Sequence, residues 1–190
     1  MSNFFSRLLW GYVFILLDIN IFIDILPDII GYLLIASALA KLSNVPSAPF
    51  TRKMAIIVGI VSILEMAIFE SLIATLPSVF EFLVRIIVIL SLLIYYYYIF
   101  KVCLELLKDS AYIGYTKKVK YFYLISLWFT IMAPYIAIHL YEAEILIVSM
   151  IVIYFIAFVT FLIYLYKMKE YARVEEKRKT EILLDKEEQS

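Results

Sequence analysis

The sequence has little of what soluble enzymes and secreted proteins use for their chemistry. It holds one cysteine and one histidine in 190 residues. The single Cys103 cannot form an internal disulfide, and the lone His139 cannot build a histidine-rich zinc site. No H-E-x-x-H, G-x-S-x-G or phosphate-loop motif is present. We therefore predict no metal, no cofactor, no nucleic-acid partner and no catalytic residue, and the sequence favours a non-enzymatic protein.

What the sequence has in excess is apolar surface. Hydrophobic residues make up 65% of the chain and the mean hydropathy is +0.95. Soluble domains contain roughly 45–50% apolar residues, so a soluble fold could not bury this much. We predict an all-α, polytopic helix bundle of about six transmembrane helices in the plasma membrane, with both termini in the cytoplasm.

Apolar segments bounded by charges or prolines give the predicted domain organisation. A transmembrane domain covers residues 1–166 and a charged cytoplasmic tail covers 167–190. The mixed charges of the tail predict a frayed helical extension of the last span. A helix needs about 20 residues to cross the hydrocarbon. The predicted spans are 5–23, 28–42, 54–76, 79–100, 122–141 and 145–166.

The stretch 8–42 is too long for one span and short for two, and Pro27 decides how it divides. Proline lacks an N–H and disfavours helix at the residue before it. We expect a turn at Asp24–Asp28 and then a second helix with Asp28 in its first turn, where a carboxylate suits the positive end of the helix dipole. Because the second helix is short, a re-entrant pair of helices remains the alternative.

Charges are sorted along the chain although the net charge is zero. Cytoplasmic loops carry an excess of Lys and Arg. In the six-span arrangement Arg85 is the one basic residue that does not fall inside, and the outer turns carry carboxylates without lysine. The inside set is Arg7, Lys41, Arg52, Lys53, Lys101, Lys108, Lys117, Lys118, Lys120 and the tail from Lys167. The same arrangement puts Cys103 inside.

Many tyrosines fall near the predicted inner ends of the later spans. Tyrosine rings settle at membrane–water interfaces. We expect these side chains to anchor helices at the cytoplasmic surface. The set is Tyr95–Tyr98, Tyr112, Tyr115, Tyr121, Tyr123, Tyr164 and Tyr166.

Ionisable residues within spans are the main candidates for function, because each costs about 2.5–3.5 kcal/mol on insertion. Glu65 and Arg85 fall within predicted spans, and Glu81 lies one helical turn before Arg85. We predict that Arg85 pairs with Glu65, Glu81 or Glu70. Such a pair either fixes two helices together or binds a substrate.

An outward-facing polar cavity would bring further residues together. Asp24 and Asp28 would lie at its mouth, where neighbouring carboxylates attract a cation, unless they form only a wetted acidic loop. His139, which follows a helix break expected at Pro134, would line its wall. The predicted ligand-binding residues are Asp24, Asp28, Glu65, Glu81, Arg85 and His139. The ligand would be a small solute, ion or peptide, for transport, sensing or immunity.

Two kinds of partner follow from the helix surfaces. Ala36 and Ala40 are four residues apart, a spacing of small residues that allows close helix packing or docking of a membrane partner protein. The lipid bilayer is the other partner, and Lys117, Lys118 and Lys120 would be attracted to its anionic headgroups.

The segment Asp24-Ile-Leu-Pro-Asp-Ile-Ile-Gly-Tyr32 resembles a D-x-LPD-x-x-GY segment of small multi-pass membrane proteins of Gram-positive bacteria. The resemblance implies a bacterial plasma membrane and carries no particular activity. It also gives a reason to suspect a functional role for Asp24, Pro27, Asp28, Gly31 and Tyr32. A looser likeness is to the intramembrane CAAX-type proteases. The segments Glu81-x-x-x-Arg85 and Tyr135-x-x-x-His139 of this chain are similar to two motifs of that family. Phe80 stands where that family has a glutamate, and the second histidine is missing.

The six-span format is also similar to the substrate-binding subunits of energy-coupling-factor vitamin transporters. A binding protein is therefore the preferred prediction. An intramembrane protease and a purely structural or interaction subunit are the alternatives.

Overall fold

The computed structural model describes residues 1–16, 26–64, 78–108, 110–137 and 143–188. Within these ranges the chain forms six α-helices and no strand, which confirms the all-α prediction. The helices are α1 (Ser2–Leu16), α2 (Leu26–Leu39), α3 (Ala48–Leu64), α5 (Ser78–Leu106), α6 (Ile113–Ala137) and α7 (Ala143–Glu188).

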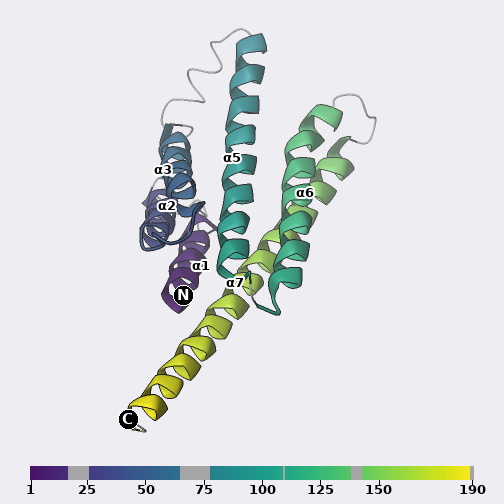
Figure 1. The fold of residues 1–190 in the computed structure, drawn as a ribbon. Helices are drawn as coiled ribbons and strands as arrows, with labels where there is room; N and C mark the ends of the chain where they lie inside the picture. Colours follow the sequence, from purple (N-terminus) through teal and green to yellow (C-terminus); the bar gives the residue numbers. More distant parts are fainter. Residues whose placement is uncertain (17–25, 65–77, 109, 138–142, 189–190) are drawn as a thin grey trace.

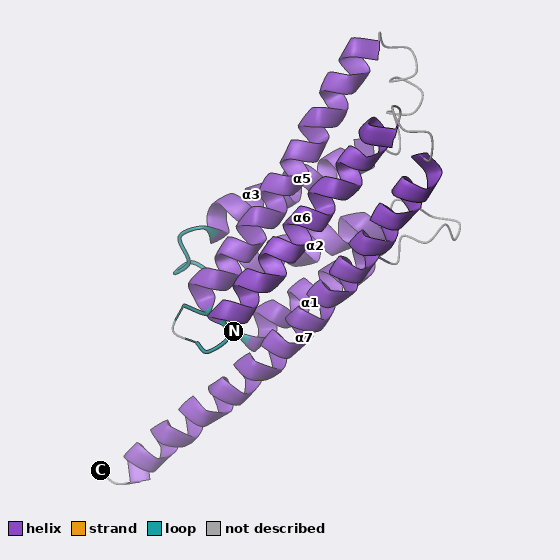
Figure 2. Ribbon diagram, turned by 90° about the vertical axis from the view of Figure 1, so that its right-hand side faces the viewer, coloured by secondary structure: helices purple, strands orange, loops and turns teal. Residues whose placement is uncertain are grey.

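The six described helices form a closed ring. Each packs against its neighbours in the chain, and α7 also packs against α1. The α2–α3 and α5–α6 connections lie at the same end as the N-terminus, and α7 projects beyond that end (Figures 1 and 2). We call this the terminal end of the bundle. Successive helices therefore alternate in direction.

Two helical segments are long and apolar enough to cross a membrane. They are Ile86–Leu106 and Ile145–Asp185, and Asp28–Leu39 is a shorter apolar helix. The structure thus contains two candidate membrane-spanning helices among its described residues. Both continue beyond the predicted spans, because α5 runs to Leu106 and α7 runs through the charged tail to Glu188.

Helix starts follow from local chemistry. In α2, Pro27 is the second residue and Asp28 lies in the first turn, as predicted, although the helix ends at Leu39 rather than at residue 42. The start of α3 is held by a neighbour, because Glu105 of α5 accepts hydrogen bonds from the Ser47 N–H at 3.1 Å and the Ser47 hydroxyl at 2.7 Å. This contact caps the first turn of α3, six residues before the predicted start.

Glycines set the closest helix crossing. A Cβ added to Gly31 would lie 2.6 Å from the Gly11 carbonyl oxygen, and one added to Gly11 would lie 2.8 Å from the Gly31 oxygen. A backbone carbonyl cannot rotate away as a flexible side chain can. Glycine at both positions is therefore what allows α1 and α2 to approach this closely.

The predicted small-residue pair lies elsewhere on α2. Ala36 is 5% exposed and belongs to the core, whereas Ala40 follows the end of the helix and is exposed. A docking face for a partner protein at these two alanines stays a prediction.

Candidate functional site

The structure describes the side chain of one predicted ligand-binding residue, Asp28. Glu81 and Arg85 lie in the first two turns of α5, one turn apart. Their predicted charge pair stays a prediction. The other three candidates, Asp24, Glu65 and His139, lie outside the described residues.

One expectation about this region is wrong. The helix α6 continues through Pro134 to Ala137, so there is no break at that proline. Proline is tolerated inside membrane helices where neighbouring groups satisfy the freed carbonyl.

Asp28 links two helices near the end of the bundle opposite to the terminal end. Its side chain is half-buried, and its Oδ2 accepts a hydrogen bond from the Ser62 hydroxyl of α3 at 3.2 Å. One turn further along α2, about 6 Å away along the axis, the side chain of Tyr32 is buried. The carboxylate therefore borders the interior of the ring.

That interior contains a continuous group of tyrosines, which we call the tyrosine cluster. Five of its six rings are buried and the sixth is half-buried. Neighbouring ring centroids are 4.9–6.0 Å apart, within the range of favourable aromatic pairs. The members, in order of contact from Asp28 inward, are Tyr32, Tyr95, Tyr12, Tyr96, Tyr123 and Tyr154, and they come from five helices.

Hydroxyl groups pair with one another inside the cluster. The Tyr12 hydroxyl donates to the Tyr95 hydroxyl at 3.1 Å, and the hydroxyls of Tyr123 and Tyr154 lie 3.3 Å apart. Burying a hydroxyl without a hydrogen bond costs free energy, so these pairs allow the hydroxyl groups to lie in an apolar interior. Phe161 closes one side, with its ring centroid 5.0 Å from that of Tyr12.

Several of these rings were expected at the membrane surface. The expectation is wrong for Tyr95, Tyr96, Tyr123 and Tyr164, which are at most 4% exposed. Other members of the same set are exposed, as an anchoring role requires. These are Tyr97, Tyr121 and Tyr166.

Sequence reasoning missed two members of the cluster, Tyr12 and Tyr154. A signal for Tyr12 was present, because Gly11 precedes it as Gly31 precedes Tyr32. The glycine allows the close crossing, and the next residue then points into the ring.

Packing loosens on the Asp28 side of the cluster. No side chain is buried over residues 86–94 of α5 or 145–156 of α7, whereas both helices contain buried side chains nearer the terminal end. Figure 1 shows α5 and α6 separating in the same direction. The tyrosine cluster therefore lies between the part of the bundle in which α5 and α7 bury side chains and the part in which the described side chains of these two helices are not buried.

No protein-family model, curated protein or solved structure matches the chain. The likeness of the segment around Pro27 to membrane proteins of Gram-positive bacteria stays a prediction. The chemistry of the site is therefore argued from its geometry. Aromatic faces, hydroxyls and a carboxylate are groups that bind cations.

Proposed function

We propose that the chain is a six-span plasma-membrane protein whose terminal end faces the cytoplasm. The alternating helices support this, because both ends of the chain and two connections lie at the terminal end (Figure 2). The distribution of charge supports it as well. Lys41, Arg52 and Lys108 lie at or near these connections, whereas Arg85 lies near the opposite end of α5.

The orientation can be tested by cysteine labelling with a membrane-impermeant maleimide. Cys103 is 0% exposed and would not react from either side, so it is replaced by serine. In that background, Ile145→Cys should react in intact cells and Lys118→Cys only after permeabilisation. The reverse pattern would overturn the orientation.

The same assay distinguishes two spans from a re-entrant pair at the start of the chain. The described parts of α1 and α2 have 15 and 14 residues, or about 22 and 21 Å, against a hydrocarbon thickness of about 30 Å. Asp24 lies in the turn predicted between the two helices, beyond the span 5–23. Asp24→Cys should react in intact cells if α1 spans and be protected if the pair is re-entrant.

For its activity, we infer that the protein binds a small cation or cationic solute that enters from outside. The observation that carries this is the half-buried Asp28 carboxylate one helical turn from the tyrosine cluster. A cation over an aromatic ring gains about 0.5–2 kcal/mol, more when desolvated. Binding of this kind would serve uptake, sensing or immunity.

The predicted outer residues would complete the site. Asp24, Glu65 and Glu81 add carboxylates, Arg85 compensates one of them, and His139 lines the wall. The preference for a cation rests on this excess of carboxylates together with the tyrosine rings.

Thermal melting of the purified full chain tests the proposal. A ligand that binds only the folded state stabilises it by about 2.7 kcal/mol at 100 times its Kd. Potassium, calcium and tetramethylammonium chlorides are titrated, and at least one should raise the melting temperature. Asp28→Asn should abolish that shift while keeping an acceptor for Ser62.

The matched control is Asp185→Asn, which removes the same charge from an exposed position in the tail. It should leave the cation shift unchanged. If no cation shifts the wild type, or if Asp28→Asn retains the full shift, the proposed function is wrong.

A further inference from the structure

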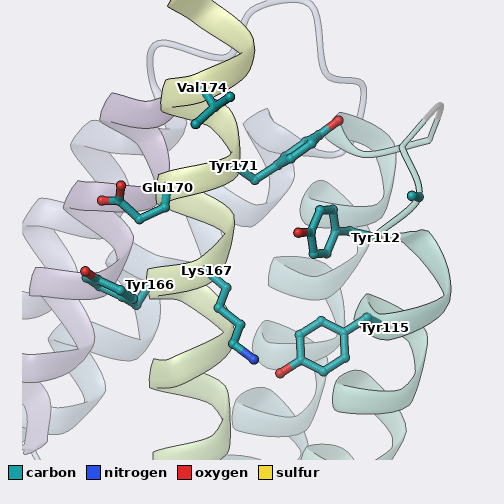
Figure 3. A pocket seen from close by; sticks show the side chains of 8 residues that line it. Tyr112, Tyr115, Tyr166, Lys167, Glu170, Tyr171 and Val174 are labelled. Atoms are coloured by element: carbon teal, nitrogen blue, oxygen red, sulfur yellow. The ribbon is translucent and has the colours of Figure 1, made fainter.

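A second site lies at the terminal end, where α7 leaves the bundle. A groove of about 720 Å³ separates the start of α6 from this part of α7 (Figure 3). Aromatic rings and two charged side chains line it. The residues that matter are Tyr112, Tyr115, Tyr166, Lys167, Glu170 and Tyr171.

The groove lies at the boundary between apolar and charged sequence. The apolar run of α7 ends at Tyr166, and from Lys167 onward the helix is rich in charge. On α6 the exposed Lys117 and Lys118 lie within one turn of Tyr115. Such a boundary, with tyrosines and lysines together, is typical of the headgroup region of a membrane.

Lys167 is directed into this groove. Its Nζ lies 5.6 Å from the centroid of the Tyr115 ring, and Figure 3 shows the side chain reaching toward that ring. Among the described residues Lys167 forms no ion pair. Glu170 points away from Tyr115 in Figure 3, and its carboxylate pairs instead with Lys169 at 3.8 Å. Within the described part of the chain, the groove therefore presents an ammonium group that forms no ion pair with the Glu170 carboxylate beside it.

The rings frame the space beside that ammonium. Tyr112 and Tyr171 pack against each other across the groove, with centroids 4.8 Å apart. Their contact joins the start of α6 to α7. A molecule with an anionic group and an apolar body would meet the ammonium on one side and ring faces on the other.

We propose that this groove binds the headgroup of an anionic phospholipid, with its phosphate against Lys167 and its glycerol against the tyrosine rings. The assignment of this lipid to the inner leaflet rests on the proposed six-span orientation. The binding itself depends only on the groove. A bound lipid would bridge α6 and α7 at the point where α7 leaves the bundle.

The test is a titration of the purified full chain in a neutral maltoside detergent, followed by native mass spectrometry. The probes are dioctanoyl phosphatidylglycerol, dioctanoyl phosphatidylcholine and glycerol 3-phosphate. Phosphatidylglycerol should bind most tightly. Lys167→Gln should weaken its binding about fivefold, the effect expected of one lysine near an anionic lipid.

Lys53→Gln is the matched control, because it removes the same charge from an exposed residue near the terminal end of α3 that does not line the groove. It should leave the affinity unchanged. Tyr171→Ala is the second groove variant and should weaken binding without changing the charge. Equal losses from Lys53→Gln and Lys167→Gln would mean diffuse surface attraction and would overturn the proposal.

Two further outcomes would also overturn it. Equal binding of phosphatidylcholine would show that the anionic charge is not recognised, and equal binding of glycerol 3-phosphate would indicate a soluble phosphate compound. Micelles have no sidedness, so the result does not depend on the orientation of the chain. Asp28→Asn should retain phosphatidylglycerol binding, and Lys167→Gln should retain the cation shift, which separates this proposal from the first.

Discussion

The crossing of α1 and α2 predicts how much stability is lost when each glycine is replaced by alanine. The Cβ of Gly31→Ala would lie 2.6 Å from the Gly11 carbonyl oxygen and 2.6 Å from Ile15 Cγ1. Ordinary contact begins near 3.4 Å, so the two helices must separate by 3.4 − 2.6 = 0.8 Å. Rotation of the isoleucine cannot relieve the contact with the backbone oxygen.

Overpacking a well-packed interior costs about 1–3 kcal/mol, and this crossing belongs at the upper end because the obstacle is backbone. Gly11→Ala should cost about as much, since its Cβ meets the Gly31 oxygen at 2.8 Å. Gly59→Ala should cost less, because its nearest neighbour, Tyr32 Cβ, is 3.0 Å away. The melting temperatures of the purified variants, measured in one detergent, give the order of these stability losses.

Gly114→Ala is the internal control, because nothing lies within 4 Å of its added Cβ. Alanine is the better helix former by about 0.5–1 kcal/mol, so this variant should be neutral or slightly more stable. If Gly31→Ala melts at the same temperature as Gly114→Ala, the helices do not cross at these glycines. The geometry described for α1 and α2 would then be refuted.

Three further perturbations test other contacts. Glu105→Leu removes the acceptor of both Ser47 hydrogen bonds and should destabilise the chain by about 1–3 kcal/mol in chemical denaturation. Tyr12→Phe removes the hydrogen bond to Tyr95 and should cost about 1 kcal/mol in the same assay. In Glu176, the hydrogen bond from the Met1 ammonium, aided by the Ser2 N–H, lowers the pKa of the carboxyl below its usual 4.5. Since the folded-state pKa is the lower one, this contact stabilises above about pH 4.5 and is lost as the pH falls through the folded-state pKa, so wild type and Glu176→Gln should converge in acid.

Each of these variants has a control and an outcome that contradicts it. Glu181→Leu and Tyr97→Phe make the same chemical changes at exposed positions and should be nearly neutral. A Tyr12→Phe variant as stable as Tyr97→Phe would mean that the buried hydroxyl pair does not stabilise the fold. A stability difference between wild type and Glu176→Gln that does not change with pH would rule out the charged contact.

The sequence predicted those features that depend on local chemistry. The start of α2 follows from Pro27 and the carboxylate after it, because proline acts on its own backbone and on the residue before it. The extension of α7 through the tail follows from the mixed charges of that segment, which suit an exposed helix. Neither inference requires knowledge of a neighbouring helix.

The inward direction of the tyrosines depends on neighbours and could not be read in this way. In a helix that is apolar on every face, periodicity does not indicate which side meets other helices. Tyr96 and Tyr97 are adjacent in sequence, yet the first is 4% exposed and the second 44%. Their positions are decided by the side chains around α5, and Tyr96 packs against Tyr12 of α1 and Tyr123 of α6.

The candidate site was predicted only in part for a related reason. Asp28 was predicted because it lies near Asp24 in sequence and neighbouring carboxylates attract a cation. Three tyrosines of the cluster, Tyr95, Tyr96 and Tyr123, were assigned to the membrane surface, since a tyrosine suits both places. Closure of the ring by α1 and α7 joins segments that lie far apart in sequence, and nothing local to either helix indicates that contact.

The length of α7 has a mechanical consequence. Its last 22 residues, 167–188, continue the helix beyond the apolar run for about 33 Å. A continuous helix of this length moves as a rigid rod, and the last packing contact before it projects is the one between Tyr112 and Tyr171. A tilt of about 10° at that contact would displace the far end by about 6 Å, slightly more than the rise of one helical turn. Small rearrangements of α7 within the bundle would therefore have a greater amplitude at its projecting end.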